Sequence, residues 1–173
     1  MMSQELCFIP ATELTRMIRE KAVSPVEVMR ETIARAETLN PRLNAICTPT
    51  YDAAMNAAAE AEDAVMRGRP LGILHGVPTS IKDLAFTRGV RTMAGSHIHR
   101  GRIPDFDHLH VERLRAAGAI SIGKTTVSEF GWSGVSSSPL TGVTHNPWKH
   151  GMNAGASSAG AAVCAAAGIG PIH

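Results

Sequence analysis

The spacing of apolar residues predicts helices over the first third of the chain. Apolar side chains recur at helical intervals across residues 14–18, with polar residues between them. A second helix is expected after Ser24, because a serine followed by proline and then by a glutamate three residues on is a typical helix start. Asn40 and Pro41 are expected to end it, since the residue before a proline disfavours helical geometry. Residues 51–67 form a third, alanine-rich helix candidate.

After this third helix the pattern changes to short apolar runs of the kind found in strands. Residues 72–83 form such a run, and Lys82 lies at its end. A helix expected over residues 107–117 leads directly into a strand expected over residues 119–123, and that order is one half of an α/β unit. Residues 44–48 are a further strand candidate. Helices and strands are therefore expected to alternate.

The length of 173 residues fits one domain with a substantial core. The composition, with 44% apolar and 18% charged residues, is that of a globular chain and not of a disordered one. We expect an α/β fold in which helices surround a mixed β-sheet. Residues 1–70 would form a mainly helical lead-in, and residues 71–173 would begin the core of the same domain.

Charge and cysteine content exclude several classes of function. A net charge of +2 gives no electrostatic basis for direct binding to nucleic acid or to an anionic membrane. The three widely spaced cysteines indicate reduced thiols, and neither a disulfide framework nor a metal site. The N-terminus lacks the features of a signal peptide, and no apolar run is long enough to span a membrane. We therefore expect a cytoplasmic protein.

The stretch with the most candidate chemistry is residues 151–160. Two glycines bracket the adjacent serines Ser157 and Ser158, with only alanines beside them. Small residues let backbone approach backbone or a ligand closely, and glycine adopts conformations that other residues avoid. The hydroxyls can therefore cap a helix expected over residues 159–167 or take part in catalysis. This stretch alone favours neither reading.

Lys82 is a second candidate, because it follows an apolar run that would carry it into the interior or to the end of a strand. Lysine is rarely buried, since removing an ammonium ion from water costs several kcal/mol. The ordinary explanations are an ion pair with the adjacent Asp83 or a side chain that extends to the surface.

Residues 118–125, from Gly118 to Thr125, match the phosphate-loop pattern G-x-x-x-x-G-K-[ST]. A phosphate loop follows a strand and opens a helix. Here the expected helix precedes the pattern, and its middle is expected to be a strand. Nucleotide binding through these residues is therefore an alternative that the context disfavours.

Two further groups of residues suggest a metal site only superficially. The histidine pairs at positions 97 and 99 and at positions 108 and 110 have no nearby cysteine or carboxylate cluster. Acidic residues at positions 60, 62 and 63 are expected on the solvated face of one helix. We therefore expect no metal site.

Residues 129–142 form a long polar stretch that contains glycine. Long ordered loops are more often binding elements than simple connectors. Gly131, Trp132 and Ser133 are the candidate substrate-binding residues in this loop, and Ser158 joins them from the serine stretch.

Taken in order, these motifs resemble those of the amidase signature enzymes. The resemblance rests on residues 76–83, the helix–strand unit at 111–125, the Asn-Pro-Trp sequence at 146–148 and the serine stretch at 155–160. It implies an amidase-signature fold and the hydrolysis of a carboxylic amide, with no metal and no organic cofactor. The chain departs from the family at three positions, with Thr126 where asparagine is common and Ala156 and Ala159 where glycine is common.

The resemblance also implies roles for particular residues. Lys82 would be the catalytic base, and Ser157, preceded by a cis peptide bond, would relay the proton. Lys82 Nζ is therefore expected within hydrogen-bond distance of the Ser157 hydroxyl, with Asp83 pointing away. The nucleophile of the family is a second serine beyond the serine pair, and it is expected to lie outside these residues. The sequence is thus expected to cover an N-terminal part of an amidase and to be inactive alone.

Two partners follow from the resemblance. The first is a small-molecule amide substrate. The second belongs to an alternative within the family, a glutamine-dependent amidotransferase, in which the chain would work together with partner chains. We also expect self-association into a homo-oligomer, because an incomplete sheet would leave an edge uncovered.

Overall fold

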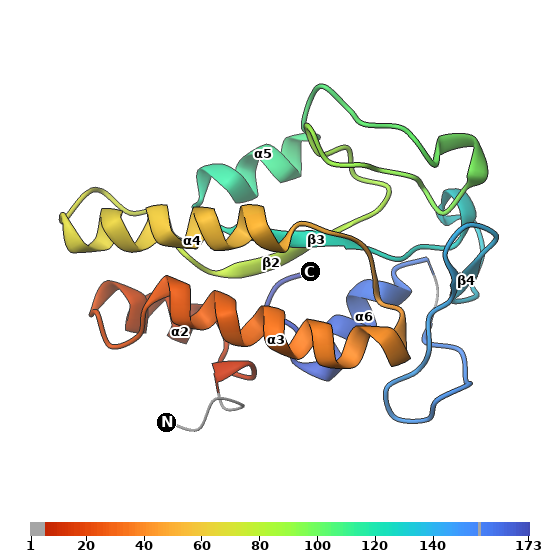
Figure 1. The fold of residues 1–173 in the computed structure, drawn as a ribbon, viewed down its shortest axis with the longest axis horizontal. Helices are drawn as coiled ribbons and strands as arrows, with labels where there is room; N and C mark the ends of the chain where they lie inside the picture. Colours follow the sequence, from red (N-terminus) through yellow and green to blue (C-terminus); the bar gives the residue numbers. More distant parts are fainter. Residues whose placement is uncertain (1–5, 156) are drawn as a thin grey trace.

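The computed structural model describes residues 6–155 and 157–173, shown in Figure 1. Helices and strands alternate through most of the chain, as the sequence pattern predicts. The helices are α2 (Ala11–Arg19), α3 (Pro25–Leu43), α4 (Tyr51–Met66), α5 (Leu109–Ala116) and α6 (Ala159–Ala167), with short 3₁₀ turns at His97–His99 and Glu129–Gly131. The strands are β1 (Ile46–Pro49), β2 (Pro78–Lys82), β3 (Ile120–Thr125), β4 (Ser137–Ser138) and β5 (Gly142–Val143).

The central sheet is mixed, with the strand order β1–β3–β2. β1 runs antiparallel to β3, and β2 runs parallel to it. The outer edge of β2 receives a short parallel bridge near the end of the chain, where the Ser80 N–H donates to the Ile172 carbonyl over 3.0 Å. The expected α/β fold with helices around a mixed sheet is confirmed. A separate hairpin pairs β4 with β5.

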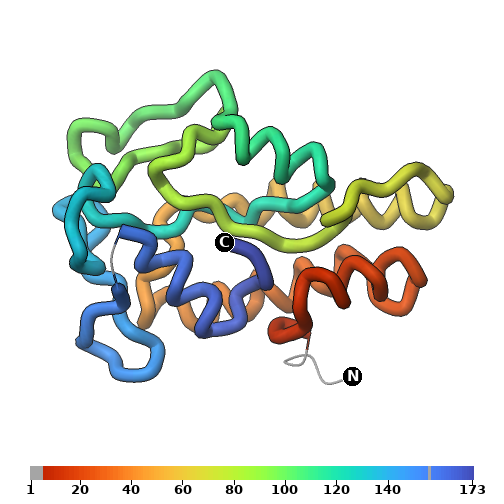
Figure 2. The backbone as a smooth tube through the Cα atoms, turned by 180° about the vertical axis from the view of Figure 1, so that it is seen from behind, coloured from red at the N-terminus to blue at the C-terminus, as the bar shows by residue number. Residues whose placement is uncertain are grey.

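Helices lie on both sides of this sheet (Figure 1). The main core cluster joins α3, α4 and α6 to Ile120 and Ile122 of β3. On the other side, Val111 of α5 packs against Ile81 and Ala85 in a cluster of its own. Figure 2 shows that the chain turns after α6 and ends beside the strands, where Ile172 bridges to Thr79 of β2. Because neighbouring residues of a strand face opposite ways, Lys82 points away from α5.

The prediction for α3 is confirmed at the start of the helix and corrected at its end. Ser24 caps the helix, and its Oγ accepts from the N–H of Val26 over 2.9 Å. The expected stop at Asn40 and Pro41 is wrong, since α3 continues to Leu43. A proline so close to the end removes one donor from the last turn only. The Asn40 side chain then accepts from the first residues leading into β1.

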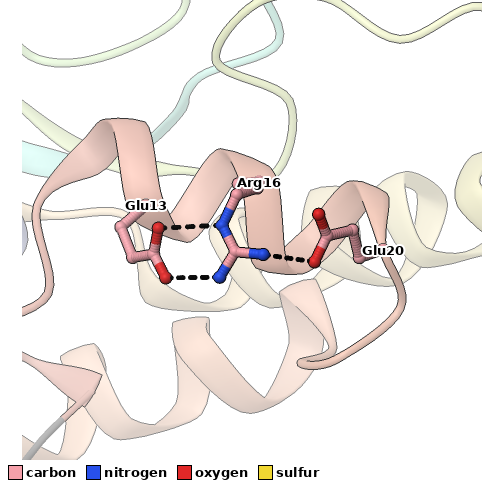
Figure 3. A network of polar contacts seen from close by, with 3 residues as sticks. All are labelled: Glu13, Arg16 and Glu20. Carbon is pink, nitrogen blue, oxygen red and sulfur yellow. Dashed lines mark hydrogen bonds and ion pairs between the residues drawn. The ribbon is translucent and has the colours of Figure 1, made fainter.

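Helix α2 is attached by its apolar side chains and not by its charges. Its buried residues are Leu14, Met17 and Ile18, as the helical spacing predicts. Arg16 is exposed and pairs with Glu13 at 2.6 Å and also with Glu20 (Figure 3). Such exposed ion pairs contribute little to stability. Burial of the apolar face therefore docks this helix.

Residues 118–125 do not form a phosphate loop. Most of the segment is strand β3, and the helix α5 precedes it. Lys124 is fully buried, and its Nζ donates to Thr87 Oγ1 over 2.9 Å, to Thr92 Oγ1 over 3.1 Å and to the Ala85 carbonyl. A lysine enclosed in this way cannot reach a nucleotide phosphate, so the nucleotide-binding alternative is wrong.

Within residues 6–155 and 157–173, no helix combines the length and the apolar character that crossing a membrane requires. In the same residues, no group of three or more His, Cys, Asp or Glu side chains is placed to hold a metal ion. Cys7, Cys47 and Cys164 are free thiols.

Candidate active site

Lys82 is the last residue of β2, where the strand leaves the sheet. The four strand residues before it are buried, whereas Lys82 itself is partly exposed to solvent. Ile81 faces α5, so the Lys82 side chain extends toward the opposite face, where α6 begins. The end of a buried strand thus places an ammonium group at the border between core and solvent.

The serine pair, Ser157 and Ser158, stands at the start of α6. Gly160 lets this helix end approach the sheet closely, because a side chain there would lie 2.4 Å from the Ala45 carbonyl oxygen and from the Thr126 nitrogen. The Gly160 N–H donates to the Thr126 carbonyl over 3.2 Å. Small residues in this stretch are therefore needed for packing as well as for any chemistry.

Lys82 and the serine pair meet through two hydrogen bonds. Lys82 Nζ lies 2.9 Å from Ser157 Oγ and 2.9 Å from Ser158 Oγ. The expected contact between Lys82 and Ser157 is present, although the two residues are 75 positions apart in sequence. The cis peptide bond expected before Ser157 involves Ala156 and lies outside the described residues.

Capping is not what the serine hydroxyls do. Ser158 occupies the N-cap position of α6, yet among the described residues its side chain forms no capping hydrogen bond. Its Oγ faces Lys82 instead. The start of α6 thus places the serine hydroxyls next to the Lys82 ammonium group. The sequence pattern alone did not distinguish this arrangement from helix capping.

The environment of Lys82 favours its neutral form. Burial lowers the pKa of Lys82 from its ordinary value of 10.5. The adjacent Asp83 does not pair with it. Asp83 is fully buried, and both of its carboxylate oxygens accept from the Met93 N–H at 3.1 Å. The ordinary explanation of Lys82 as an ion-pair partner of Asp83 is therefore wrong, and the expected turn of Asp83 away from Lys82 is present.

The loop that holds the other predicted residues begins beside the end of β2. The Phe130 N–H donates to the Ala94 carbonyl over 2.8 Å, and Gly131 packs so closely on Leu84 that a side chain there would lie 2.5 Å from Leu84 Cδ1. The Ser133 carbonyl accepts from Ser128 Oγ over 3.1 Å. The loop is thus anchored two residues past Lys82.

Trp132 is exposed, with 80% of its surface accessible. Across the described ranges, Gly131, Trp132 and Ser133 form no hydrogen bond to Lys82 or to the serine pair. Lys82, Ser157 and Ser158 are therefore joined by hydrogen bonds in which the three loop residues take no part.

One polar residue next to the serine pair was not singled out from the sequence. Asn153 uses its side chain to join residues 134 and 136 to Gly155. The signal in the sequence was an asparagine two residues before a glycine, a pattern typical of a turn in which the side chain bonds to the backbone.

The chain is similar to several known proteins. The amidase family model matches residues 27–173. An acylamidase of Rhodococcus erythropolis is 39% identical over 172 residues, which cover 99% of this chain and 36% of that protein. A glutamyl-tRNA(Gln) amidotransferase subunit of Carboxydothermus hydrogenoformans is 38% identical over 164 residues, covering 95% of this chain and 34% of that protein.

A solved structure gives the same result. The structure of a bacterial aryl acylamidase of the amidase signature enzymes family superposes with a TM-score of 0.89 at 32% identity. The match covers 94% of this chain and 34% of that one. The chain therefore spans about a third of the length of the relatives that it matches.

Proposed function

The chain belongs to the amidase family, and on that premise we propose that it supplies the lysine and the serine pair of an enzyme that hydrolyses a carboxylic amide. The observation that carries the proposal is the hydrogen bond of 2.9 Å between Lys82 Nζ and Ser157 Oγ. A base and a hydroxyl within hydrogen-bond distance have the geometry that proton transfer requires.

In the proposed reaction, the proton of the nucleophile passes through Ser157 to Lys82. Neutral Lys82 accepts the Ser157 hydroxyl proton while Ser157 Oγ takes the proton of the attacking hydroxyl. The same path in reverse delivers a proton to the leaving amine as the C–N bond breaks. The nucleophile and the donors that stabilise the oxyanion are proposed to come from residues beyond these 173.

Two features of the site support Lys82 as the base. A lysine must lose its proton near neutral pH to serve in this role, and burial shifts the pKa of Lys82 in that direction. Asp83, which would favour the ammonium form if it turned toward Lys82, is held by the Met93 N–H. Ser158 is proposed to orient Lys82 in addition to contacting the substrate.

The proposed substrate-binding loop is residues 131–133. Gly131, Trp132 and Ser133 follow an anchor on Leu84, so they are close in the fold to the end of β2. An exposed tryptophan offers a large apolar surface to the acyl or amine part of an amide. The proposed location is the cytoplasm, which the three free cysteines favour.

A second candidate is the amide-cleaving component of a glutamine-dependent amidotransferase. The identity of 38% to the Carboxydothermus amidotransferase protein supports it nearly as well as the acylamidase supports simple amide hydrolysis. Both reactions break a carboxylic amide, so the contact of Lys82 with Ser157 suits either one. Glutamine hydrolysis, measured beside hydrolysis of a simple aryl amide, separates the two.

The test is a chimera in which these 173 residues replace the matching segment of the Rhodococcus acylamidase. Lys82→Ala and Ser157→Ala should each lower kcat by about 100- to 10,000-fold, since each removes one end of the proton path. Lys149→Ala, at an exposed lysine, is the matched control and should remain close to the parent. A Lys82→Ala chimera with full activity would overturn the proposal. Residues 1–173 alone should show no turnover.

A further inference from the structure

The loop of residues 128–136 connects the two halves of the candidate site. At its start it is seated on residues that follow Lys82, through the hydrogen bond from Phe130 to Ala94 and the packing of Gly131 on Leu84. At its end it meets the residues that lead into the serine pair. Any change in the second attachment therefore alters how the loop and the serine pair sit relative to Lys82.

The second attachment is centred on the side chain of Asn153. Its Oδ1 accepts from the Ser136 N–H over 2.9 Å and from the Gly155 N–H over 3.2 Å. Its Nδ2 donates to the Gly134 carbonyl over 3.2 Å. One side chain thus joins the end of the loop to the backbone two residues before Ser157.

Ser136 reinforces this attachment from the loop side. Its Oγ accepts from the Ala154 N–H over 3.0 Å and donates to the Thr144 carbonyl over 2.8 Å. Ser136 and Thr144 are buried, while Asn153 is exposed. Ser136 thus forms the buried part of the second attachment, and Asn153 forms its exposed part.

The partners of position 153 match the amide of asparagine. Two of them are N–H donors and require an acceptor, which fixes the orientation of the amide, and the third is a carbonyl that requires a donor. Aspartate keeps the two acceptor bonds and loses the donor bond. Alanine loses all three.

We propose that Asn153 is a positioning residue, which holds the serine pair in place against the loop of residues 128–136 so that the Ser157 hydroxyl stays on Lys82 Nζ. The proposal rests on the proposed function, since it assigns to Asn153 the alignment of that site. Asn153 itself touches neither Lys82 nor the serine hydroxyls among the bonds of its side chain.

The test uses NMR of the 173-residue chain labelled with ¹³C at lysine Cε. The chain has only four lysines, at positions 21, 82, 124 and 149, so each titration can be followed separately. Asn153→Ala should raise the pKa of Lys82 toward its ordinary value, because water would replace the displaced serine hydroxyls as partner of the ammonium group and would also remove the burial that lowers the pKa. Asn153→Asp should give a smaller rise, and the titrations of Lys21 and Lys149 should stay unchanged.

Asn146→Ala is the matched control. Asn146 is an amide in the same segment, and it bonds to the Asn153 carbonyl over 3.2 Å and to the Trp148 N–H over 2.9 Å without reaching the loop of residues 128–136. Its removal should leave the titration of Lys82 as in the wild type. A general loss of stability would not shift the titration of Lys82 in Asn153→Ala while leaving it unchanged in Asn146→Ala.

The outcomes separate the role of Asn153 from the proposed function. A Lys82 titration unchanged in Asn153→Ala, in a chain where Ser157→Ala does change it, overturns the role of Asn153. An ordinary Lys82 titration in the wild type, insensitive to Ser157→Ala, overturns the proposed function instead. If Asn153→Ala unfolds the chain and all four lysines become alike, Asn153→Asp, which keeps two of the three bonds, is judged by the same criterion.

Discussion

Two lysines on neighbouring strands show how differently one fold can use the same side chain. Lys82 ends β2 at the border with solvent, and its Nζ donates to two serine hydroxyls. Lys124 lies inside β3 with no exposed surface, and its Nζ donates to a carbonyl and two threonine hydroxyls. Their side chains leave the sheet on opposite faces.

The pKa alone does not separate the proposed base Lys82 from Lys124. Burial lowers the pKa of Lys124 to about 8, against the opposing attraction of the Asp83 carboxylate, and it also lowers the pKa of Lys82. Lys124 is surrounded on all sides, and its partners are a carbonyl and hydroxyls of the segment that it holds together. Lys82 is accessible, and its partners are the hydroxyls of the serine pair. Access and the type of partner therefore favour Lys82 over Lys124 as the proposed base.

The largest effect should come from removing the buried amine. Lys124→Met keeps most of the side-chain volume but leaves the Ala85 carbonyl and two threonine hydroxyls without their partner, and it removes the positive charge that attracts the buried Asp83 carboxylate. The free energy of unfolding should fall by about 3–5 kcal/mol, as when one partner of a buried charged group is removed.

Chemical denaturation of the chain measures this loss. Lys82→Met is the matched control, because Lys82 is partly exposed and water can replace it as the partner of the two serine hydroxyls. Lys82→Met should change the free energy of unfolding by no more than about 1 kcal/mol. Equal losses in the two variants would contradict the distinction between the lysines.

The second effect is a dependence of stability on pH that belongs to Lys124. Below pH 8 both the folded and the unfolded state carry the proton, so the cost of burying the charge is constant. Between pH 8 and the ordinary value of 10.5 the unfolded state binds more protons, and the free energy of unfolding should therefore rise with pH. The rise should be about 3 kcal/mol, from about 1.4 kcal/mol for each pH unit between the two pKa values.

Denaturation at several pH values, with the wild type compared with Lys124→Met, isolates this contribution. Cys47 and Cys164 act in the opposite direction, because burial raises the pKa of each thiol to about 12 and folding then loses stability as the unfolded thiols ionise. The contribution of Cys164 is the same in either protein and is removed by the difference between the two curves, whereas Cys47 lies in the field of Lys124 and is replaced by alanine in both proteins. If the free energies of unfolding of the wild type and Lys124→Met changed equally with pH, the assignment of this pH dependence to Lys124 would be contradicted.

The smallest effect concerns the serine pair. Ser157→Ala and Ser158→Ala each remove one acceptor of the Lys82 ammonium group, and each should lower the pKa of Lys82 slightly, because the charged form loses a hydrogen bond. NMR titration of the ¹³C-labelled lysines measures both changes. A change at Lys124 in either variant would mean that the two lysines are coupled, contrary to their positions on opposite faces.

Local pattern and motif order were sufficient to predict much of the fold and the central contact. The helical spacing of Leu14, Met17 and Ile18 predicted α2, and the small residues after Ser158 predicted α6 with its observed bounds. The motif resemblance predicted the approach of Lys82 to Ser157, which neither local segment could reveal alone.

Other features depend on contacts between distant segments, which the sequence pattern does not contain. The partners of Lys124 lie in a loop at positions 85, 87 and 92, so a strand pattern could not reveal that its amine is enclosed. The sequence pattern predicts the end of α3 too early, because it does not reveal that Asn40 Oδ1 accepts hydrogen bonds from the N–H groups of Ala45 and Ile46 at the start of β1. Asn153 was passed over because its partners at positions 134 and 136 belong to another loop.

Lys82 is the proposed reactive base, whereas Lys124 is a structural support. Brief treatment of the chain with an amine-acetylating reagent near neutral pH, followed by mass-spectrometric mapping of the four lysines, tests this distinction most directly. Lys82 should react fastest, because it is accessible and more of it is neutral; the exposed Lys21 and Lys149 should follow, and Lys124 should stay unmodified in the folded chain. Modification of Lys124 ahead of Lys82, or a Lys82 that reacts no faster than Lys149, would contradict the account.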